Sequence, residues 1–227
     1  MRYLLTSLLC VFTLSLTAQV DCQGPDFNND SIIGAADIIV FLTYYGNEWP
    51  LAPEFVCGET IAHQDYAYST VQIGDQCWFS ENCRYLPEVS PPNEESNTDP
   101  YYYVYGYEGT DVAAAQATEN YATYGVLYNW PAVMTAGICP SGWHIPSDEE
   151  FTELTDFLGG EGVAGGMMKD DILWNGSNSS GFSGLPGGYR YSGGFGNVGN
   201  YGDWWSASES GSSSLKRLLG YNDDSVA

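Results

Sequence analysis

The chain has 227 residues, with 29 Asp and Glu against 6 Lys and Arg, and a formal net charge of −23 at pH 7. A surface this acidic repels phosphate groups, which argues against nucleic acids and anionic membranes as partners. Divalent cations are favoured instead, although such a surface also simply keeps an exported protein soluble.

The first residues predict a secretory signal peptide over residues 1–18. Arg2 supplies the positive charge, an apolar run extends from Leu4 to Leu16, and Ala18 is the small residue before the cleavage site. The apolar run is shorter than the roughly 20 residues that span a membrane, and no second run follows. We therefore expect no transmembrane segment and a secreted protein, either extracellular or on the cell surface.

Six cysteines are present, of which Cys10 lies in the predicted signal peptide. The others are expected to form disulfides in an oxidising compartment. Cys77 and Cys83 are close enough in sequence to close a tight loop, and Cys22 can tie the N-terminal segment to Cys57. Cys139 is then left unpaired: either it is a buried free thiol, or its partner lies beyond Ala227 and the domain is incomplete.

Residues 26–37, DFNNDSIIGAAD, predict a calcium-binding loop. Calcium prefers about six to eight oxygen ligands, and this spacing supplies carboxylate, amide and carbonyl oxygens. The expected ligands are Asp26, Asn28, Asp30, Asp37 and the carbonyl of Ile32. The alternative is an Asx-rich turn that binds no metal.

An apolar helical stripe over residues 38–42 follows this loop, and together they resemble one dockerin repeat. A complete dockerin has two repeats, and only one is present, so cohesin binding does not follow from the resemblance. We expect a loop-and-helix module over residues 19–50 and a linker over residues 51–56. Calcium, bound in the module, is the only cofactor that the sequence predicts.

The remainder, residues 57–227, shows the pattern of short strands and turns. Residues 66–87 alternate and then turn at Gly74-Asp75, which predicts a hairpin. Residues 101–109 predict an aromatic strand, and residues 124–134 predict a buried segment with Tyr128 and Trp130 turned inward.

One helix is predicted from its ends. Ser147 and Glu150 form a capping box that begins it, and Gly159-Gly160 ends it. Its apolar residues recur at spacings of three and four, at Phe151, Leu154, Phe157 and Leu158. Glycine-rich connections follow, with an aromatic strand over residues 203–206. Long loops held by a few strands and a helix indicate an α+β domain.

Five motifs in order resemble the Fibrobacter succinogenes major paralogous domain over residues 57–227. They are YSTVQIGDQCWFSENCRYLP, YGVLYNWPAVM, CPSGWHIPSDEEFTELTDFLGG, GFSGLPGGYR and WWSASES. The resemblance implies further strands and a cysteine after Ala227, in agreement with the unpaired Cys139. It also implies a small, irregular, loop-rich fold similar to the C-type lectins and the sulfatase-modifying factors.

Catalysis is not expected. His63 and His144 adjoin no recognisable nucleophile motif, so a Ser-His-Asp hydrolase has no support in the sequence. Acidic pairs are abundant enough to arise by chance, which makes a glycosidase pair uninformative. A hydrolase is therefore the third and weakest interpretation.

Aromatic residues set among glycine, serine and asparagine favour a binding surface, because flat apolar rings beside adaptable hydrogen-bonding groups suit sugars and protein loops. The expected contact residues are Trp174, Tyr189, Tyr191, Tyr201 and Trp205, whereas Trp204 is expected in the core. The sequence thus predicts a non-catalytic binding or adhesion module for polysaccharide or an extracellular protein. The alternative is a structural component of an extracellular assembly with no small ligand.

Overall fold

The computed structural model describes residues 11–13, 55–192, 194–211 and 213–227. The predicted calcium loop, Cys22, most of the linker and all but three residues of the predicted signal peptide lie outside these ranges. Residues from Cys57 to Ala227 belong to one compact unit, together with a short strand, β1 (Val11–Thr13). Within the described ranges, no helix is long and apolar enough to cross a membrane.

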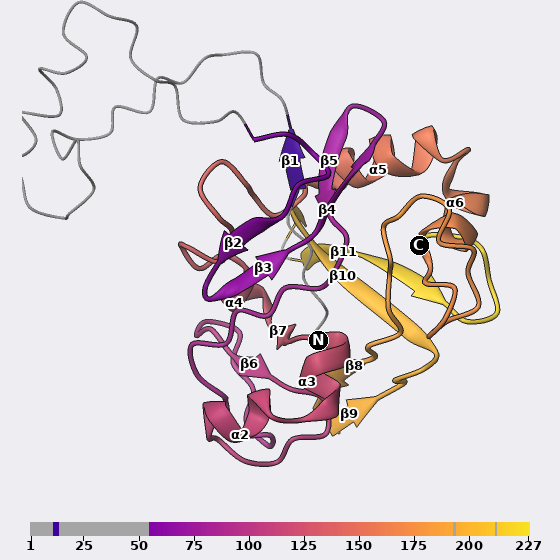
Figure 1. The fold of residues 1–227 in the computed structure, drawn as a ribbon. Helices are drawn as coiled ribbons and strands as arrows, with labels where there is room; N and C mark the ends of the chain where they lie inside the picture. Colours follow the sequence, from indigo (N-terminus) through magenta and orange to yellow (C-terminus); the bar gives the residue numbers. More distant parts are fainter. Residues whose placement is uncertain (1–10, 14–54, 193, 212) are drawn as a thin grey trace, which may run out of the picture. The chain divides into compact units, whose positions relative to one another are not determined.

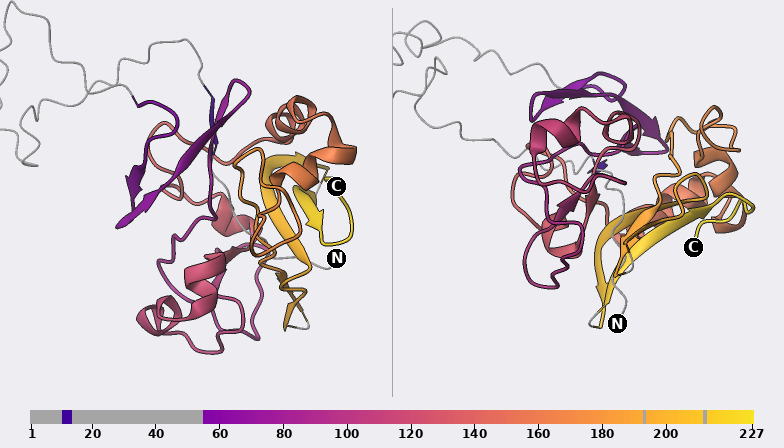
Figure 2. Two further views of the ribbon diagram at one scale, coloured as in Figure 1. Left: turned by 45° about the vertical axis from the view of Figure 1, so that its right-hand side comes forward. Right: turned by 90° about the horizontal axis from the view of Figure 1, so that it is seen from below.

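The unit is a small α+β domain of short antiparallel sheets and short helices (Figures 1 and 2). Among the described residues, one sheet has three strands in the order β1-β5-β4, and the others are the pairs β2-β3, β6-β7, β8-β9 and β10-β11. The strands after β1 are β2 (Ile61–His63), β3 (Tyr66–Tyr68), β4 (Thr70–Ile73), β5 (Gln76–Phe79), β6 (Tyr102–Tyr103), β7 (Leu127–Tyr128), β8 (Tyr189–Tyr191), β9 (Gly194–Gly196), β10 (Tyr201–Ser210) and β11 (Ser213–Gly220). The helices are α2 (Val112–Gln116), α3 (Glu119–Tyr124), α4 (Trp130–Val133), α5 (Asp148–Phe157) and α6 (Glu161–Met168).

The predicted capped helix is α5. Ser147 Oγ accepts a hydrogen bond from the Glu150 backbone N–H at 3.1 Å, and Glu150 Oε2 accepts one from the Ser147 N–H at 2.7 Å. Phe151 and Leu154 are fully buried, as the spacing predicts. Phe157 departs from this face: the residue is 65% exposed, and its ring lies over Gly74, where a Cβ would stand 3.1 Å from the ring.

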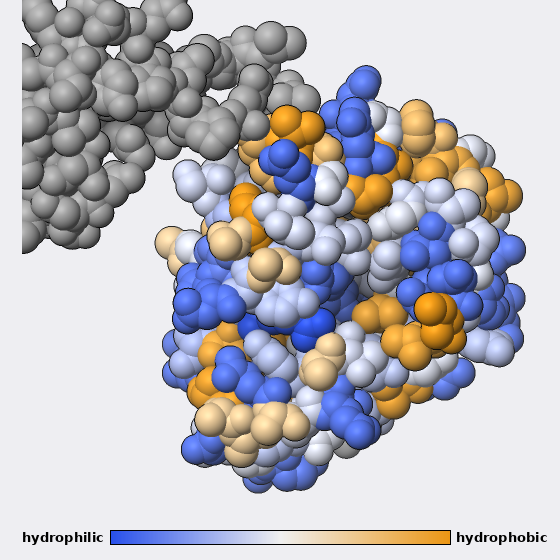
Figure 3. All heavy atoms as spheres, in the orientation of Figure 1, coloured by the Kyte–Doolittle hydropathy of each residue, from blue (hydrophilic) through white to orange (hydrophobic). Residues whose placement is uncertain are grey.

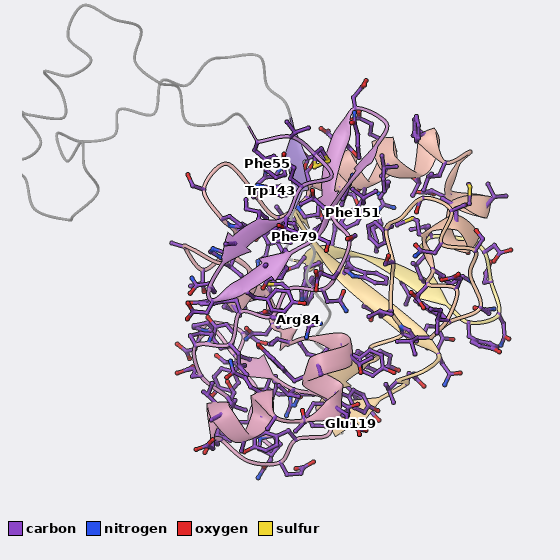
Figure 4. All side chains as sticks on the ribbon, in the orientation of Figure 1. Phe55, Phe79, Arg84, Glu119, Trp143 and Phe151 are labelled. Atoms are coloured by element: carbon purple, nitrogen blue, oxygen red, sulfur yellow. A yellow bond between two sulfur atoms is a disulfide. The ribbon has the colours of Figure 1, made fainter. Side chains whose placement is uncertain are left out.

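The predicted hairpin is β4-β5, with its turn at Gly74-Asp75 and a positive φ of 62° at Gly74 that a glycine adopts readily. The other edge of β5 pairs with β1, so β5 is the central strand. The aromatic side chains of β5 meet those of α5 and the preceding loop (Figure 4): the ring centroids of Trp78 and Phe151 lie 5.2 Å apart, and those of Phe79 and Trp143 lie 4.6 Å apart. Rings in tilted contact at such distances stabilise a core beyond the area they bury.

The longest element is the hairpin β10-β11, which the sequence predicts only in part. The aromatic strand over residues 203–206 is the middle of β10, and its partner β11 was not expected. Trp204 is buried in the core, as predicted, and its indole Nε1 donates to Asn82 Oδ1 at 3.0 Å. Tyr128 is buried as well, whereas Trp130 is only half-buried.

The cysteine pairing differs from the predicted one. Cys57 is joined to Cys77, with their Cα atoms 5.8 Å apart, and Cys83 is a buried free thiol that accepts a hydrogen bond from Tyr128. The predicted disulfides Cys77–Cys83 and Cys22–Cys57 are therefore both wrong, because Cys57 and Cys77 are bonded to each other. Cys139 is disulfide-bonded, which corrects the expectation that it is left unpaired.

Candidate functional site

The hairpin β8-β9 presents two different faces. Arg190 and Phe195 oppose each other in the register and point inward, where the Phe195 ring lies 5.2 Å from the ring of Tyr105. Side chains alternate along a strand, so Tyr189 and Tyr191 stand on the opposite face. Both tyrosines are half-buried. The inner face of the hairpin β8-β9, which Figure 1 locates in the fold, therefore packs on the domain, and Tyr189 and Tyr191 are on its outer face.

Arg190 anchors the inner face. Its side chain is buried, and its guanidinium lies 4.4 Å from the ring centroid of Tyr103. Its Nε donates to the Pro92 carbonyl at 3.2 Å, and Nη1 donates to Glu95 Oε1 at 3.1 Å. A buried guanidinium needs this many partners, because an unpaired charge in the interior is strongly destabilising. The hairpin is therefore fastened to the acidic loop that precedes β6.

The outer face is a pair of rings over glycine. Tyr189 pairs with Gly196 and Tyr191 with Gly194 in the register, and the two tyrosine rings lie 5.8 Å apart. A Cβ on Gly196 would stand 3.3 Å from the Tyr191 ring and 3.5 Å from the Tyr189 ring. Because the glycines of β9 have no side chains, the two tyrosine rings can lie against the neighbouring strand. The result is an aromatic surface on the hairpin, which we call the tyrosine face.

A groove of about 490 Å³ adjoins this surface, between the start of β10, the end of β11 and the turn that follows. Asn197 belongs to both features, because it lines the groove and its Nδ2 donates to the hydroxyl of Tyr189. Exposed rings and short polar side chains dominate the lining, namely Asn197, Asn200, Tyr201, Tyr221, Asn222, Asp223 and Ser225. Such a mixture offers both flat apolar faces and hydrogen-bonding groups.

Lys169 holds the far wall of the groove in place. Its side chain is fully buried, and its ammonium donates to the carbonyls of Gly220 at 3.2 Å and Asp223 at 2.8 Å. The same ammonium lies 3.3 Å from Asp224 Oδ1. Hydrogen bonds from Ser225 also hold the pKa of the Asp223 carboxyl below its ordinary value. The turn after β11 is therefore fixed by buried polar contacts.

The predicted contact residues divide into two groups. Tyr189, Tyr191 and Tyr201 lie at the surface, and Tyr201 is 38% exposed. Trp174 and Trp205 are buried, which corrects their placement on the binding face. Trp205 donates from Nε1 to the Tyr128 carbonyl at 2.8 Å, and the ring of Trp174 lies 5.8 Å from Lys169 Nζ. Both indoles therefore belong to the interior.

Two residues that line the groove, Asn197 and Tyr221, were not among the contact residues predicted from the sequence. The signal available for Asn197 was the alternation of tyrosine in residues 189–191 with glycine in residues 194–196, which predicts a hairpin followed by a polar turn. Tyr221 carried no such signal, because its position depends on the unexpected strand β11.

The two histidines have structural contacts. His63 Nε2 donates to the carbonyls of Gly137 and Ile138 at 3.1 and 3.2 Å. His144 Nε2 lies 2.8 Å from Glu150 Oε1. Across residues 11–13, 55–192, 194–211 and 213–227, no group of three or more His, Cys, Asp or Glu side chains is arranged to hold a metal ion.

Comparison with known proteins identifies one family. A family model described as the Fibrobacter succinogenes major domain matches residues 71–225, which is more than half of the chain. No curated protein and no solved structure matches the chain.

Proposed function

We propose, on the premise that the chain belongs to the Fibrobacter succinogenes major domain family, that this domain is a non-catalytic binding module of the cell exterior. Its ligand is a polysaccharide, held by the tyrosine face of β8-β9 and the adjoining groove. The proposal rests chiefly on one observation: Tyr189 and Tyr191 lie over a glycine strand, next to a groove lined by amides, hydroxyls and a carboxylate.

The chemistry of this surface suits sugars. A pyranose ring has an apolar face that stacks on an aromatic ring and an edge of hydroxyls that need hydrogen-bonding partners. The tyrosine face supplies the rings, and Asn197, Asn200 and Asp223 supply donors and acceptors. Because buried contacts of Arg190 and Lys169 hold both parts in place, little order has to be gained on binding.

An extracellular location supports the same interpretation. A disulfide such as Cys57–Cys77 persists in an oxidising compartment and is rare in a reducing cytosol. A signal peptide over residues 1–18 would deliver the chain there, and its cleavage would remove β1 and leave β5 paired with β4 alone. We also propose that the fold follows the C-type-lectin-like or sulfatase-modifying-factor-like plan, since short sheets and short helices are joined by long loops.

The test is binding to an array of cell-wall and algal polysaccharides, comparing the unchanged chain with the double variant Tyr189→Ala/Tyr191→Ala. We expect at least about a tenfold loss of affinity, or about 1.4 kcal/mol. Phe157→Ala is the matched control, because it removes another exposed ring, from α5. Thermal melting of each variant establishes that it folds.

Three results would overturn the proposal. The first is an unchanged chain that binds none of the polysaccharides but co-purifies with protein partners, which would favour a structural component of an extracellular assembly. The second is a double variant that binds as well as the control. Release of reducing ends from a bound polysaccharide at neutral pH would show that the module is an enzyme.

A further inference from the structure

A second cleft, with a volume of about 750 Å³, lies beside the first half of α5. One part of its lining is apolar and includes Met134, Ile138 and Ile145. Another part is acidic and comes from one helix, with Glu149, Glu150 and Glu153. None of these residues belongs to the groove next to the tyrosine face.

The carboxylates of this cleft are not equivalent. Glu150 is engaged through both oxygens, by His144 at 2.8 Å and by the Ser147 N–H at 2.7 Å. Glu153 accepts one hydrogen bond at Oε2, from Gln76 at 3.1 Å. Glu149 is exposed. Two negative charges therefore stand at the cleft with capacity to accept further hydrogen bonds.

Within the described residues, no lysine or arginine forms an ion pair with Glu149 or Glu153. All the lysines and arginines there are engaged with other acids: Arg84 with Glu81, Lys169 with Asp224, Arg190 with Glu95, Lys216 with Asp203, and Arg217 with Asp148 and Glu161. The uncompensated charge thus favours a positive group from another molecule.

The apolar part of the lining favours a positive group that is carried on an apolar stem. Met134 is 56% exposed, and methionine is a flexible side chain that adapts to varied ligands. Lysine and arginine lay their apolar stems along such a surface while keeping the charged end in a polar setting. We infer that the cleft is a docking site for a lysine or arginine side chain of a protein partner, with the stem against Met134 and the charge at Glu149 and Glu153.

NMR titration of the whole chain with small probes tests this inference. The probes are the N-acetyl N-methylamides of lysine and arginine, and the norleucine derivative is the neutral control with a similar stem. Two reporters lie in the cleft: the imidazole of His144, one of only two histidines, and the methyl group of Met134. We expect saturable shifts of both signals with at least one cationic probe, and at least about tenfold weaker binding of norleucine. The two cationic probes distinguish an ammonium from a guanidinium.

Two double variants sharpen the test. Glu149→Gln/Glu153→Gln is expected to weaken binding of the cationic probe at least about tenfold. Glu59→Gln/Glu108→Gln removes the same net charge from other exposed positions and should leave binding unchanged. The inference is overturned if neither cationic probe shifts the reporters at about 50 mM, if norleucine binds equally well, or if both double variants behave alike. None of these results depends on polysaccharide binding.

Discussion

The indole Nε1 of Trp204 donates to Oδ1 of Asn82 at 3.0 Å, across 122 positions of the sequence, with both side chains buried. The Nδ2 of Asn82 in turn donates to the Tyr124 carbonyl at 2.9 Å. One amide therefore joins β10 to the segment after β5 and to the end of α3.

The variant Asn82→Ala should be strongly destabilised. It leaves the Trp204 N–H and the Tyr124 carbonyl without partners, and an unsatisfied buried polar group costs about 1–3 kcal/mol. We expect a fall of about that size in the free energy of unfolding, measured by urea titration. Asn93→Ala, at an exposed position, is the control and should match the unchanged chain. Equal stability of the two variants would show that the Asn82 amide is dispensable.

Features encoded by neighbouring residues were predictable. The capping box at Ser147 and the turn at Gly74 depend on residues a few positions apart, and both predictions are confirmed. The burial of Trp205 could not be read in this way, because its indole bonds to Tyr128, 77 positions earlier. Its neighbours in sequence describe an aromatic strand but do not say which face is covered.

The strand β11 was missed for a related reason. Its sequence, SSLKRLLG, places Lys216 and Arg217 side by side, which is typical of an exposed segment. Their charges are matched by distant acids instead: Lys216 Nζ lies 2.8 Å from Asp203, and Arg217 reaches Asp148 and Glu161 at 2.8 and 2.9 Å. The disulfide Cys57–Cys77 was missed because cysteine spacing restricts pairing but does not determine it.

The His144–Glu150 contact predicts a pH dependence. Burial alone would raise the pKa of Glu150, but hydrogen bonds from His144 and Ser147 outweigh it and hold the pKa below the usual 4.5. The ionised carboxylate therefore stabilises the fold above pH 4.5, and this contribution is lost as the pH falls through the pKa of the folded state.

The variant Glu150→Gln should thus be less stable than the unchanged chain by about 1 kcal/mol at pH 7. The gap should narrow as the pH falls below 4.5. Urea titrations at several pH values measure this difference in the free energy of unfolding. Glu149→Gln removes a charge from the same helix start without removing these bonds, so its gap should be smaller at pH 7. A gap for Glu150→Gln that stays constant with pH would contradict the assignment.

Two glycines of α6 should respond to alanine in opposite ways. Gly162 is exposed with open space around it, so Gly162→Ala should stabilise the chain by about 0.5–1 kcal/mol through helix propensity. A Cβ on Gly165 would stand 2.7 Å from the carbonyl oxygens of Asp224 and Ser225. Gly165→Ala should therefore destabilise it by about 1–3 kcal/mol, because the closely packed backbone has to move.

The segment that Gly165 approaches is also tied to α6 by the Val226 N–H, which donates to the Glu161 carbonyl at 2.8 Å. Thermal or urea unfolding of the two variants measures both effects in one helix. If both substitutions stabilise the chain, the segment does not pack on Gly165 as described.

The calcium loop of residues 26–37 lies outside the described residues and stays a prediction. If it binds calcium through Asp26, Asn28, Asp30, Ile32 and Asp37, metal will stabilise only the form in which these oxygens converge. A calcium concentration about a hundredfold above Kd then adds about 2.7 kcal/mol to the stability of that form.

Calorimetric titration of chelator-treated protein with calcium chloride measures binding directly. Asp30→Ala should abolish the heat signal, whereas Asn29→Ala should keep it, because the fourth loop position supplies no ligand. An unchanged chain that gives no signal, or equal signals from the two variants, would favour the metal-free Asx-rich turn.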